Sequence, residues 1–416
     1  MIRNFRIALR NKLLDLLYRV NLLLVGSTPR SDGRRVLVLP GADGWEGGAP
    51  FSFGDEMLAV GLFGGLKEAG FEGADVLCLA TEGQKKVDVY EYPVQIIGLI
   101  GGWLSLSSYS QIRIMAKKYS HFVVIGADVL DGAYSEINST QRLRFLNILA
   151  KCGLKTVVTG FSFNGSDNAE IRSLFQDAER RGAAIYARER ESLVRLNSFL
   201  ERPLQAADLA FKVHIDEFLV RDHIKLLIEK IRIARSKGVF VIAVNICGWH
   251  IKDKKQFYAE FASSLDRACP FENIAIVLIP HDTRDEVGSD LNALLELRDY
   301  LDGLAPIIGG PEDVTSGIDA KLVVGACDVL ITGRMHLAIA ALHQGVPAVS
   351  FSYQGKFEGL YDLFKLPRSL MVDYADPVAA VEVLYDVARN REKFTNQILA
   401  ALPTVQRLAD ENFKLI

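Results

Sequence analysis

The sequence predicts an α/β protein with two doubly wound, Rossmann-like parallel sheets, one in each half of the chain. Short apolar runs such as "RRVLVLPG" and "VFVIAVNI" alternate with helix-length amphipathic segments along most of the 416 residues. The runs are nearly continuous in Val, Ile and Leu, which is typical of parallel strands that helices cover on both faces. A chain of 416 residues also has room for two domains, since one domain typically takes about 100–200 residues.

The first series of predicted strands lies in residues 31–215, where we expect an N-terminal α/β domain. "RRVLVLPG" is followed by a Gly-rich loop and a predicted helix over 55–69. The series continues with "ADVLCLA", "HFVVIGA", "KTVVTGFS" and "AIYAR", and helical stretches such as "STQRLRFLNILAKCG" lie between these runs. The alternation of strand and helix predicts parallel pairing of these strands.

The second series follows a long charged helix, "DEFLVRDHIKLLIEKIRIARSKG", which we expect to link the two halves over 216–237. "VFVIAVNI", "NIAIVLIPH", "DVLIT" and "PAVSFSY" then predict a C-terminal α/β domain over 238–376, and residues 377–416 have a helical pattern. Ligands of doubly wound sheets bind beyond the carboxyl ends of the strands. We therefore expect the functional site in a cleft between the two domains.

Charge and composition exclude several classes of protein. The net charge of −3 argues against a general nucleic-acid binder, which would carry a basic excess. The five cysteines are scattered and form no CxxC pair, so we expect neither a disulfide framework nor a zinc site, and we infer a reducing compartment. No apolar run reaches the roughly 20 residues that span a bilayer.

The N-terminal stretch "MIRNFRIALRNKLLDLLYRVNLLLVG" predicts a basic amphipathic helix within residues 1–30. Its charges are interspersed among the apolar residues, so a signal peptide is not expected. Two interpretations stay open. The helix packs on the body of the protein, or residues 1–24 lie on an anionic membrane surface. The second would place a cytoplasmic protein at the inner face of the membrane.

The stretch "TGRMHLAIAALHQGVPAVSF" places an arginine and a histidine where a strand passes into a helix. Gly345 fits the helix C-terminus, and Pro347 follows where a helix cannot continue. The backbone N–H groups at the helix N-terminus favour an anion. Arg334 adds a planar fork for a carboxylate or phosphate, and His336 is placed to contact the same ligand. Alternatively, Arg334 pairs with a protein carboxylate and His336 fills the junction.

The longer stretch "TGRMHLAIAALHQGVPAVSFSYQGKFEGL" resembles the C-terminal motif of the polysaccharide pyruvyl transferase family. That motif reads Ser-x-Arg-Leu-His, a helix ending in Gly-Val-Pro, a strand, and then Tyr-x-x-Lys and Gly. Thr332 and Met335 are mild departures from it. The matching positions are Arg334, His336, Tyr353, Lys356 and Gly359.

Shorter motifs upstream of this stretch also resemble motifs of the family, and they occur in the same order. The whole resemblance runs from about residue 37 to 366. "YARERESLVRL" resembles its Arg-Asp/Glu-x-x-Ser element, and "AADLAF" resembles the Asp-x-Ala-Phe that follows. "SFGDEMLAV" resembles Asn-x-Gly-Asp-Glu, with Ser52 where Asn is expected. The positions in register are Gly54, Asp55, Glu56, Arg188, Glu189, Ser192, Asp208 and Phe211.

The resemblance implies a fold of the GT-B glycosyltransferase type and transfer of a pyruvyl group from phosphoenolpyruvate to a sugar. The product is a pyruvate ketal on an exopolysaccharide or other cell-envelope glycan, or on its lipid-linked precursor. Phosphoenolpyruvate is a co-substrate, and neither a cofactor nor a metal is implied. Arg334, Arg188, His336 and Lys356 would bind phosphoenolpyruvate, and His336 would transfer a proton. Asp55 would serve as the base, and Gly54, Glu56 and Tyr353 would line the acceptor pocket.

Other interpretations stay open for these residues and for the whole chain. His336 could bind phosphate without transferring protons. Asp55 and Glu56 could favour a helix N-terminus, Arg188 could be a structural ion-pair partner, and Lys356 a solvated charge. His281 follows a predicted strand and is expected to be a structural residue. The chain as a whole could instead be a GT-B-type glycosyltransferase or epimerase that uses a nucleotide sugar, or a non-catalytic glycan-binding protein.

Overall fold

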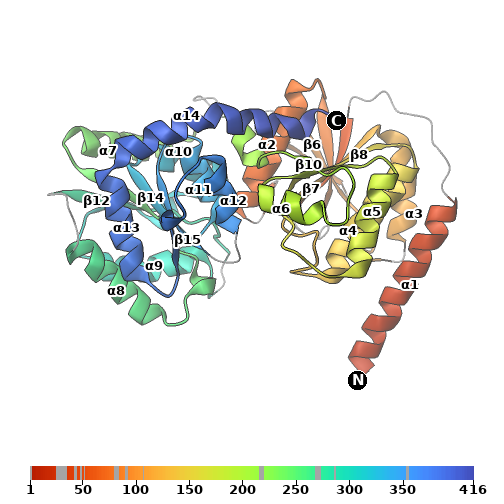
Figure 1. The fold of residues 1–416 in the computed structure, drawn as a ribbon, viewed down its shortest axis with the longest axis horizontal. Helices are drawn as coiled ribbons and strands as arrows, with labels where there is room; N and C mark the ends of the chain where they lie inside the picture. Colours follow the sequence, from red (N-terminus) through yellow and green to blue (C-terminus); the bar gives the residue numbers. More distant parts are fainter. Residues whose placement is uncertain are drawn as a thin grey trace. The chain divides into compact units, whose positions relative to one another are not determined.

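The structure is a computed structural model, and it divides into two compact units (Figure 1). It describes residues 2–24, 35–41, 45–46, 49–50, 52–78, 84–89, 92–105, 107–214, 220–267, 273–284, 287–352 and 356–416. The first unit contains Met1–Pro50, Leu58–Lys212 and Leu408–Ile416, and the second contains Phe51–Met57 and Val213–Arg407. The short segment Phe51–Met57 thus groups with residues that lie more than 150 positions further along the chain.

The first unit is built on an eight-stranded sheet in the order β10-β9-β8-β7-β1-β4-β6-β5. All neighbouring strands run parallel except β5, which is antiparallel to β6 at the edge. The chain winds outward from β1 in both directions, which is the doubly wound arrangement. The strands are β1 (Arg35–Leu39), β4 (Gly73–Cys78), β5 (Gln84–Val89), β6 (Tyr92–Gly98), β7 (His121–Ala127), β8 (Lys155–Phe161), β9 (Ala184–Ala187) and β10 (Leu204–Gln205).

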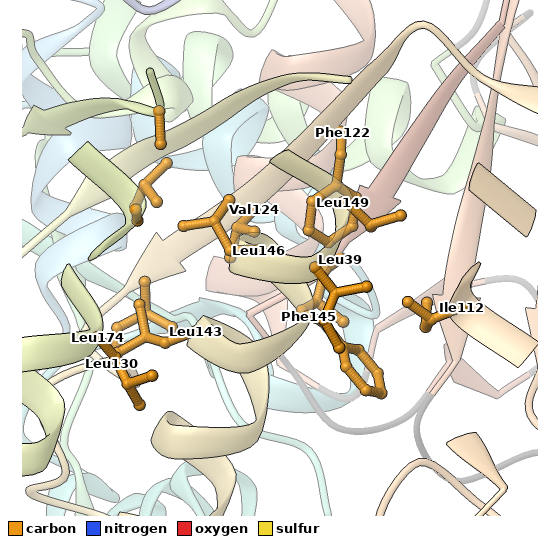
Figure 2. Packing of buried hydrophobic residues seen from close by; sticks show 14 of the residues in the cluster. Leu39, Ile112, Phe122, Val124, Leu130, Leu143, Phe145, Leu146, Leu149 and Leu174 are labelled. Atoms are coloured by element: carbon orange, nitrogen blue, oxygen red, sulfur yellow. The ribbon is translucent and has the colours of Figure 1, made fainter. Parts of the chain in front are cut away.

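Helices cover this sheet and close its core. Helix α4 is buried along most of its length, and the side chain of Ser135 caps its N-terminus by accepting a hydrogen bond from the Asn138 N–H. Figure 2 shows Leu146 and Leu149 of α4 beside strand residues Phe122 and Val124. The helices in or entering this unit are α1 (Ile2–Leu24), α2 (Phe53–Glu68), α3 (Ser108–Met115), α4 (Glu136–Lys151), α5 (Ala169–Arg180) and α6 (Arg190–Leu196).

The second unit contains a fully parallel six-stranded sheet in the order β13-β12-β11-β14-β15-β16. The strand order reverses between β11 and β14, which is the topological switch point where doubly wound sheets bind ligands. The strands are β11 (Phe240–Val244), β12 (Ile274–Leu278), β13 (Ile307–Gly309), β14 (Val329–Thr332), β15 (Ala348–Ser352) and β16 (Met371–Asp373).

The helices of the second unit follow its strands in the alternation that the sequence predicts, so the predicted fold class is confirmed. The predicted linking helix corresponds to α7, which packs on β11 and α10. The C-terminal segment forms two helices. The elements are α7 (Asp222–Ser236), α8 (Lys254–Arg267), α9 (Asp290–Leu301), α10 (Gly317–Ala326), α11 (Met335–Leu342), α12 (Lys356–Leu363), α13 (Pro377–Arg389) and α14 (Arg391–Asp410).

Helix α1 packs on the first unit. Leu14 and Tyr18 are buried, and the guanidinium of Arg144 lies 5.4 Å from the centre of the Tyr18 ring while it pairs with Asp15. Lys151 donates from Nζ to the carbonyl of Leu22. Within the described residues, no helix combines the length and the apolar character needed to cross a membrane.

Lys321 of α10 is buried in the second unit. Its Nζ donates to the carbonyl of Val213 and lies 2.7 Å from Nδ1 of His343. Burial lowers the pKa of Lys321 to about 7. The charged form of this lysine is therefore less stable in the folded protein than in the unfolded chain.

We expect this lysine to make the free energy of unfolding change with pH in the neutral to alkaline range. Between pH 7 and 10 the unfolded chain binds the lysine proton and the folded protein does not, so the free energy of unfolding rises with pH, by up to about 1.4 kcal/mol per pH unit. Below pH 7 the lysine is charged in both states, and its full unfavourable contribution applies. Lys321→Met should remove this slope in urea unfolding at pH 7, 8 and 9, and Lys117→Met, at an exposed position, should keep it. An unchanged slope in Lys321→Met would contradict the assignment.

Candidate active site

The carboxyl end of the second sheet is organised around Asn245, which follows β11. Its backbone N–H donates to the carbonyl of Ile331 at 2.9 Å. Its side-chain Oδ1 accepts from Thr332 Oγ1 at 2.8 Å and from the Gly333 N–H at 3.3 Å, and its Nδ2 donates to Asp290 Oδ2 at 2.9 Å. One buried amide therefore ties together the ends of β11 and β14 and the start of α9 at the switch point.

Asp290 holds Arg334 in a fixed orientation. Arg334 donates from Nη2 to Asp290 Oδ1 at 2.7 Å and from Nε to both carboxylate oxygens at 3.0 and 3.1 Å. The Asp290 side chain is fully buried, whereas the Arg334 side chain is 21% exposed. Burial raises the pKa of Asp290, although Arg334 acts in the opposite direction. Arg334 does pair with a protein carboxylate, and its side chain stays partly exposed at the carboxyl end of the sheet.

A second arginine–aspartate pair lies beside the first. Arg284 donates to the buried Asp282 carboxylate from Nη2 at 2.6 Å and from Nε at 2.9 Å, and Arg334 Nη2 lies 3.5 Å from the same group. Burial alone would raise the pKa of Asp282, but Arg284 and Arg334 outweigh it and hold the pKa below its ordinary value. Two carboxylates and two guanidinium groups therefore share this edge of the sheet.

Two histidines complete this group. His336 lies in the first turn of α11, and His281 follows β12. Their rings are nearly parallel, at 8°, with centroids 6.2 Å apart. Burial, followed by the nearby His336 and Arg334, lowers the pKa of His281 well below its ordinary value, so its imidazole is neutral near pH 7.

The buried Nε2 of His281 has no hydrogen-bond partner among the described residues. The side chain is only 4% exposed, so bulk water does not satisfy this atom. A buried polar atom without a partner costs about 1–3 kcal/mol, and such atoms in native proteins commonly meet a ligand or an ordered water. His281 is therefore a candidate ligand contact, whereas the sequence suggested a structural histidine.

Gly54 lies against both imidazole rings. The Phe53 N–H donates to the carbonyl of His281 at 3.2 Å, and Ser52 forms a β-bridge with Asp282. These contacts place the backbone of Gly54 so close that a Cβ atom would lie 2.4 Å from Nδ1 of His336 and 3.0 Å from Cε1 of His281. Glycine is required here because any side chain would displace the rings.

Asp55 and Glu56 belong to the same short segment as Gly54. Asp55 accepts from the Ser52 hydroxyl at 2.6 Å and donates its N–H to that hydroxyl at 3.1 Å, which caps α2. Glu56 is buried and accepts from the N–H of Gly317, the first residue of α10, at 2.7 Å. Both carboxylates thus have a role at a helix N-terminus, and both group with the second unit rather than with the rest of α2.

Arg188 lies at the carboxyl end of β9 in the first unit and is only 4% exposed. It donates from Nε to Ser162 Oγ at 2.6 Å and from Nη1 to Asp208 Oδ2 at 2.9 Å. Burial would lower the pKa of Arg188, but the carboxylates of Asp208 and Glu189 outweigh it and raise the pKa. These contacts join the ends of β8, β9 and β10, and a role in ligand binding stays a prediction.

The structure describes little of the predicted positions after β15. Lys356 is the first residue of α12, but its side chain lies outside the described part of the chain, as does all of Tyr353. In the part that is described, no group of three or more His, Cys, Asp or Glu side chains is arranged to hold a metal ion. Among the described residues, the candidate ligand contacts are thus Arg334, His336, His281 and the segment with Gly54, supported by Asn245, Asp282 and Asp290.

Sequence reasoning found Arg334, His336 and Gly54 but assigned no role to Asn245, Asp282 or Asp290. Asn245 and Asp282 had a detectable signal, since each is a polar residue within or just after a long apolar run, in "VFVIAVNI" and "VLIPHD". Asp290 had none, because it sits in an ordinary helix start after a loop. Its importance comes from its contact with Arg334, 44 residues away.

Comparison with solved structures supports the GT-B type of fold. A provisionally assigned UDP-N-acetylglucosamine 2-epimerase from Listeria monocytogenes is 13% identical with a TM-score of 0.56, covering 91% of this chain and 94% of that one. S. aureus MnaA in complex with UDP is 12% identical with a TM-score of 0.53, over 91% and 94%. The α,α-trehalose 6-phosphate synthase from Burkholderia multivorans is 11% identical with a TM-score of 0.53, over 92% and 97%. At such low identity the likeness concerns the fold alone.

The sequence comparisons are more specific. No curated protein matches the chain. The family model "Polysaccharide pyruvyl transferase" matches residues 53–355, which begins within the Gly54 segment and includes both histidines and Arg334. The match covers well over half of the chain and confirms the resemblance seen in its motifs. The protein is a transferase enzyme that belongs to the polysaccharide pyruvyl transferase family.

Proposed function

We propose that the protein transfers a pyruvyl group from phosphoenolpyruvate to a sugar of a surface polysaccharide or its lipid-linked precursor, forming a pyruvate ketal. The observation that carries this proposal is the Arg334 fork, which Asp290 orients beside His336 and His281 at the switch point of the second sheet. A preorganised cation beside two imidazoles suits a small, strongly anionic donor on which protons must move.

Phosphoenolpyruvate carries a carboxylate and a phosphate, so its site needs several hydrogen-bond donors. Arg334 has a partly exposed side chain, and the N-terminus of α11 adds backbone N–H groups and the helix dipole. His336 lies in the first turn of that helix. We propose Arg188 and Lys356 as further donors to the carboxylate and the phosphate.

The reaction requires protonation of the donor before the sugar attacks. His336 gives a proton to the methylene carbon of phosphoenolpyruvate, which becomes the methyl group and leaves an oxocarbenium-like centre at C2. One sugar hydroxyl bonds to C2 and loses its proton to a base. The C2–O bond to phosphate then breaks with its electron pair moving to the phosphate. The second hydroxyl bonds to C2, loses its proton and closes the ketal. The protons balance: the two sugar hydroxyls release two protons, the methylene carbon takes up one, and the departing phosphate carries away the other.

Two side chains are candidates for the base. Asp55 is the candidate from sequence, and its carboxylate accepts from the Ser52 hydroxyl. His281 is neutral near pH 7 and its buried Nε2 has no partner among the described residues, so it is a second candidate. We propose Asp55, the base expected from the sequence, with His281 as the alternative that the structure adds. Gly54, Glu56 and Tyr353 are proposed to shape the acceptor pocket.

Thermal unfolding with candidate donors tests the proposal. A ligand present at about 100 times its dissociation constant stabilises the folded protein by roughly 2.7 kcal/mol, so the unfolding midpoint should rise by a few degrees. We expect this rise with phosphoenolpyruvate and not with nucleotide sugars. A rise only with a nucleotide sugar would refute pyruvyl transfer and assign the protein to the glycosyltransferases or epimerases.

Gly54→Ala is expected to slow pyruvyl transfer by about 100-fold, because misplacing catalytic groups by about 1 Å can cost that much. The new methyl group would push on the His336 ring at Nδ1. Gly64→Ala on the same helix is the matched control, since its Cβ would meet nothing closer than a carbonyl oxygen at 3.7 Å. The rate of ketal formation and the far-ultraviolet circular dichroism of both variants provide the test. Full activity in Gly54→Ala would rule out a functional constraint on the ring positions.

We propose a cytoplasmic location at the inner face of the membrane for this activity. Phosphoenolpyruvate is a cytoplasmic metabolite, and lipid-linked sugar precursors are assembled at the inner membrane face. The four cysteines in the described residues are free and buried, which suits a reducing compartment. The proposal accommodates either a polymeric or a lipid-linked acceptor.

A further inference from the structure

Helix α1 has a second apolar face that the first unit leaves uncovered. The covered face contains Leu14 and Tyr18, which are 1% and 5% exposed. The uncovered side chains are Leu13, Leu16, Val20, Leu23 and Leu24, which are 39%, 56%, 39%, 82% and 66% exposed. With 3.6 residues per turn, these five fall within an arc of about 100° on one side of the helix. We call them the outer face of α1.

The helix is held in place, so the outer face is presented in a defined orientation. Asp15 pairs with Arg144 at 3.2 Å, and Arg144 also lies over the Tyr18 ring. Arg10 donates to the carbonyl of Leu104 at 3.1 Å, and Lys151 donates to that of Leu22. Packing on the protein body and exposure of an apolar face are therefore compatible, and α1 does not have to detach for the outer face to meet a partner.

The charged side chains of α1 that flank the outer face are positive. Lys12 and Arg19 lie on one edge of the arc, and Arg10 on the other, and all three are exposed. Asp15 is the only acidic residue in the helix and is engaged with Arg19 and Arg144. Exposed leucines flanked by lysine and arginine are typical of helices that lie in the interface of anionic membranes.

The composition of the outer face favours a lipid surface over a protein partner. All five of its residues are Leu or Val, with no aromatic side chain among them. The residues that dominate protein–protein binding energy are enriched in Trp, Tyr and Arg, and Leu and Val are under-represented among them. We propose that the outer face of α1 binds an anionic phospholipid bilayer, with its leucines entering the acyl boundary and Lys12 and Arg19 at the headgroups.

Co-sedimentation of the 416-residue chain with vesicles tests this proposal independently of the donor. The probes are phosphatidylcholine vesicles with about 30% phosphatidylglycerol and vesicles of phosphatidylcholine alone. We expect binding to the anionic vesicles only, with loss of most binding at about 0.5 M salt because the charges are then screened. The double variant Leu16→Gln, Leu23→Gln should bind at least about ten times more weakly, since both apolar side chains leave the lipid.

Matched variants separate lipid binding from general effects. Leu226→Gln with Leu415→Gln replaces two leucines that are 65% and 52% exposed elsewhere, and binding should be unchanged. Lys12→Gln with Arg19→Gln should weaken vesicle binding and reduce its dependence on salt.

The proposal is overturned if the wild-type protein does not bind anionic vesicles, or if Leu16→Gln, Leu23→Gln binds them as well as the wild type. It is equally overturned if this double variant abolishes self-association in sedimentation velocity while no form binds vesicles, since a second copy of the chain would then cover the face.

Discussion

Replacing Arg334 by alanine is expected to weaken phosphoenolpyruvate binding by at least about 100-fold, equivalent to roughly 2.8 kcal/mol. Hydrogen bonds to the buried Asp290 hold the guanidinium of Arg334 at the switch point, where the donor is proposed to bind. Calorimetric titration with phosphoenolpyruvate measures the loss directly. The same substitution leaves Asp290 buried and unpaired, so it should also lower the free energy of unfolding by about 3–5 kcal/mol.

Two further variants separate binding from folding. Arg334→Met combined with Asp290→Asn removes both charges, so stability should largely return while phosphoenolpyruvate binding stays lost. Arg334→Lys keeps the charge but not the planar fork, and it should bind more weakly than the wild type. Arg298→Ala, which breaks an exposed pair with Glu312 in the same unit, is the control and should bind normally. Wild-type affinity in Arg334→Met, Asp290→Asn would show that Arg334 does not contact the donor.

His336→Gln is expected to reduce kcat by about 100- to 10,000-fold while the affinity for phosphoenolpyruvate changes by less than about tenfold. This pattern follows from a residue that moves a proton in the transition state. The opposite pattern, in which affinity falls and kcat is preserved, would mean that His336 only binds phosphate. His223→Gln, at an exposed histidine of α7 in the second unit, is the control and should leave both quantities unchanged.

His281→Gln gives a different result if His281 is the base for the sugar hydroxyl. Protonation of phosphoenolpyruvate would still occur, so incorporation of solvent deuterium into the methylene group should continue. Transfer to the sugar should be slow. His336→Gln should lose both exchange and transfer. If Asp55→Asn rather than His281→Gln shows exchange without transfer, the base is Asp55.

Much of the fold was predictable because local patterns determine it. The Val, Ile and Leu runs "VFVIAVNI" and "NIAIVLIPH" became β11 and β12, and the stretch before Gly345 became α11. Strand polarity follows from the helices between the strands, because a connection of that length returns the chain in the same direction. The exception is the edge strand β5, whose antiparallel pairing depends on a short connection to β6.

The site was predictable only in part because its organisation is non-local. Arg334 and His336 stand in one motif, but the Asn245 side chain that organises the site bonds to Thr332, 87 residues away. His281 resembles any histidine at a strand end until the packing around its Nε2 is known. The contact of Gly54 with both rings depends on the segment Phe51–Met57 joining the second unit, and no periodicity in the sequence indicates that.

The division of the chain also limits how the enzyme can be recombined. The segment Phe51–Met57 supplies Gly54 to the imidazole pair and Glu56 to the start of α10, yet the chain reaches the rest of the second unit only at Val213. A chimera that exchanges C-terminal halves at residue 213 would therefore combine the histidines of one parent with the glycine segment of the other. Functional hybrids should require both segments from the same parent, and shuffled libraries should show these two distant stretches inherited together.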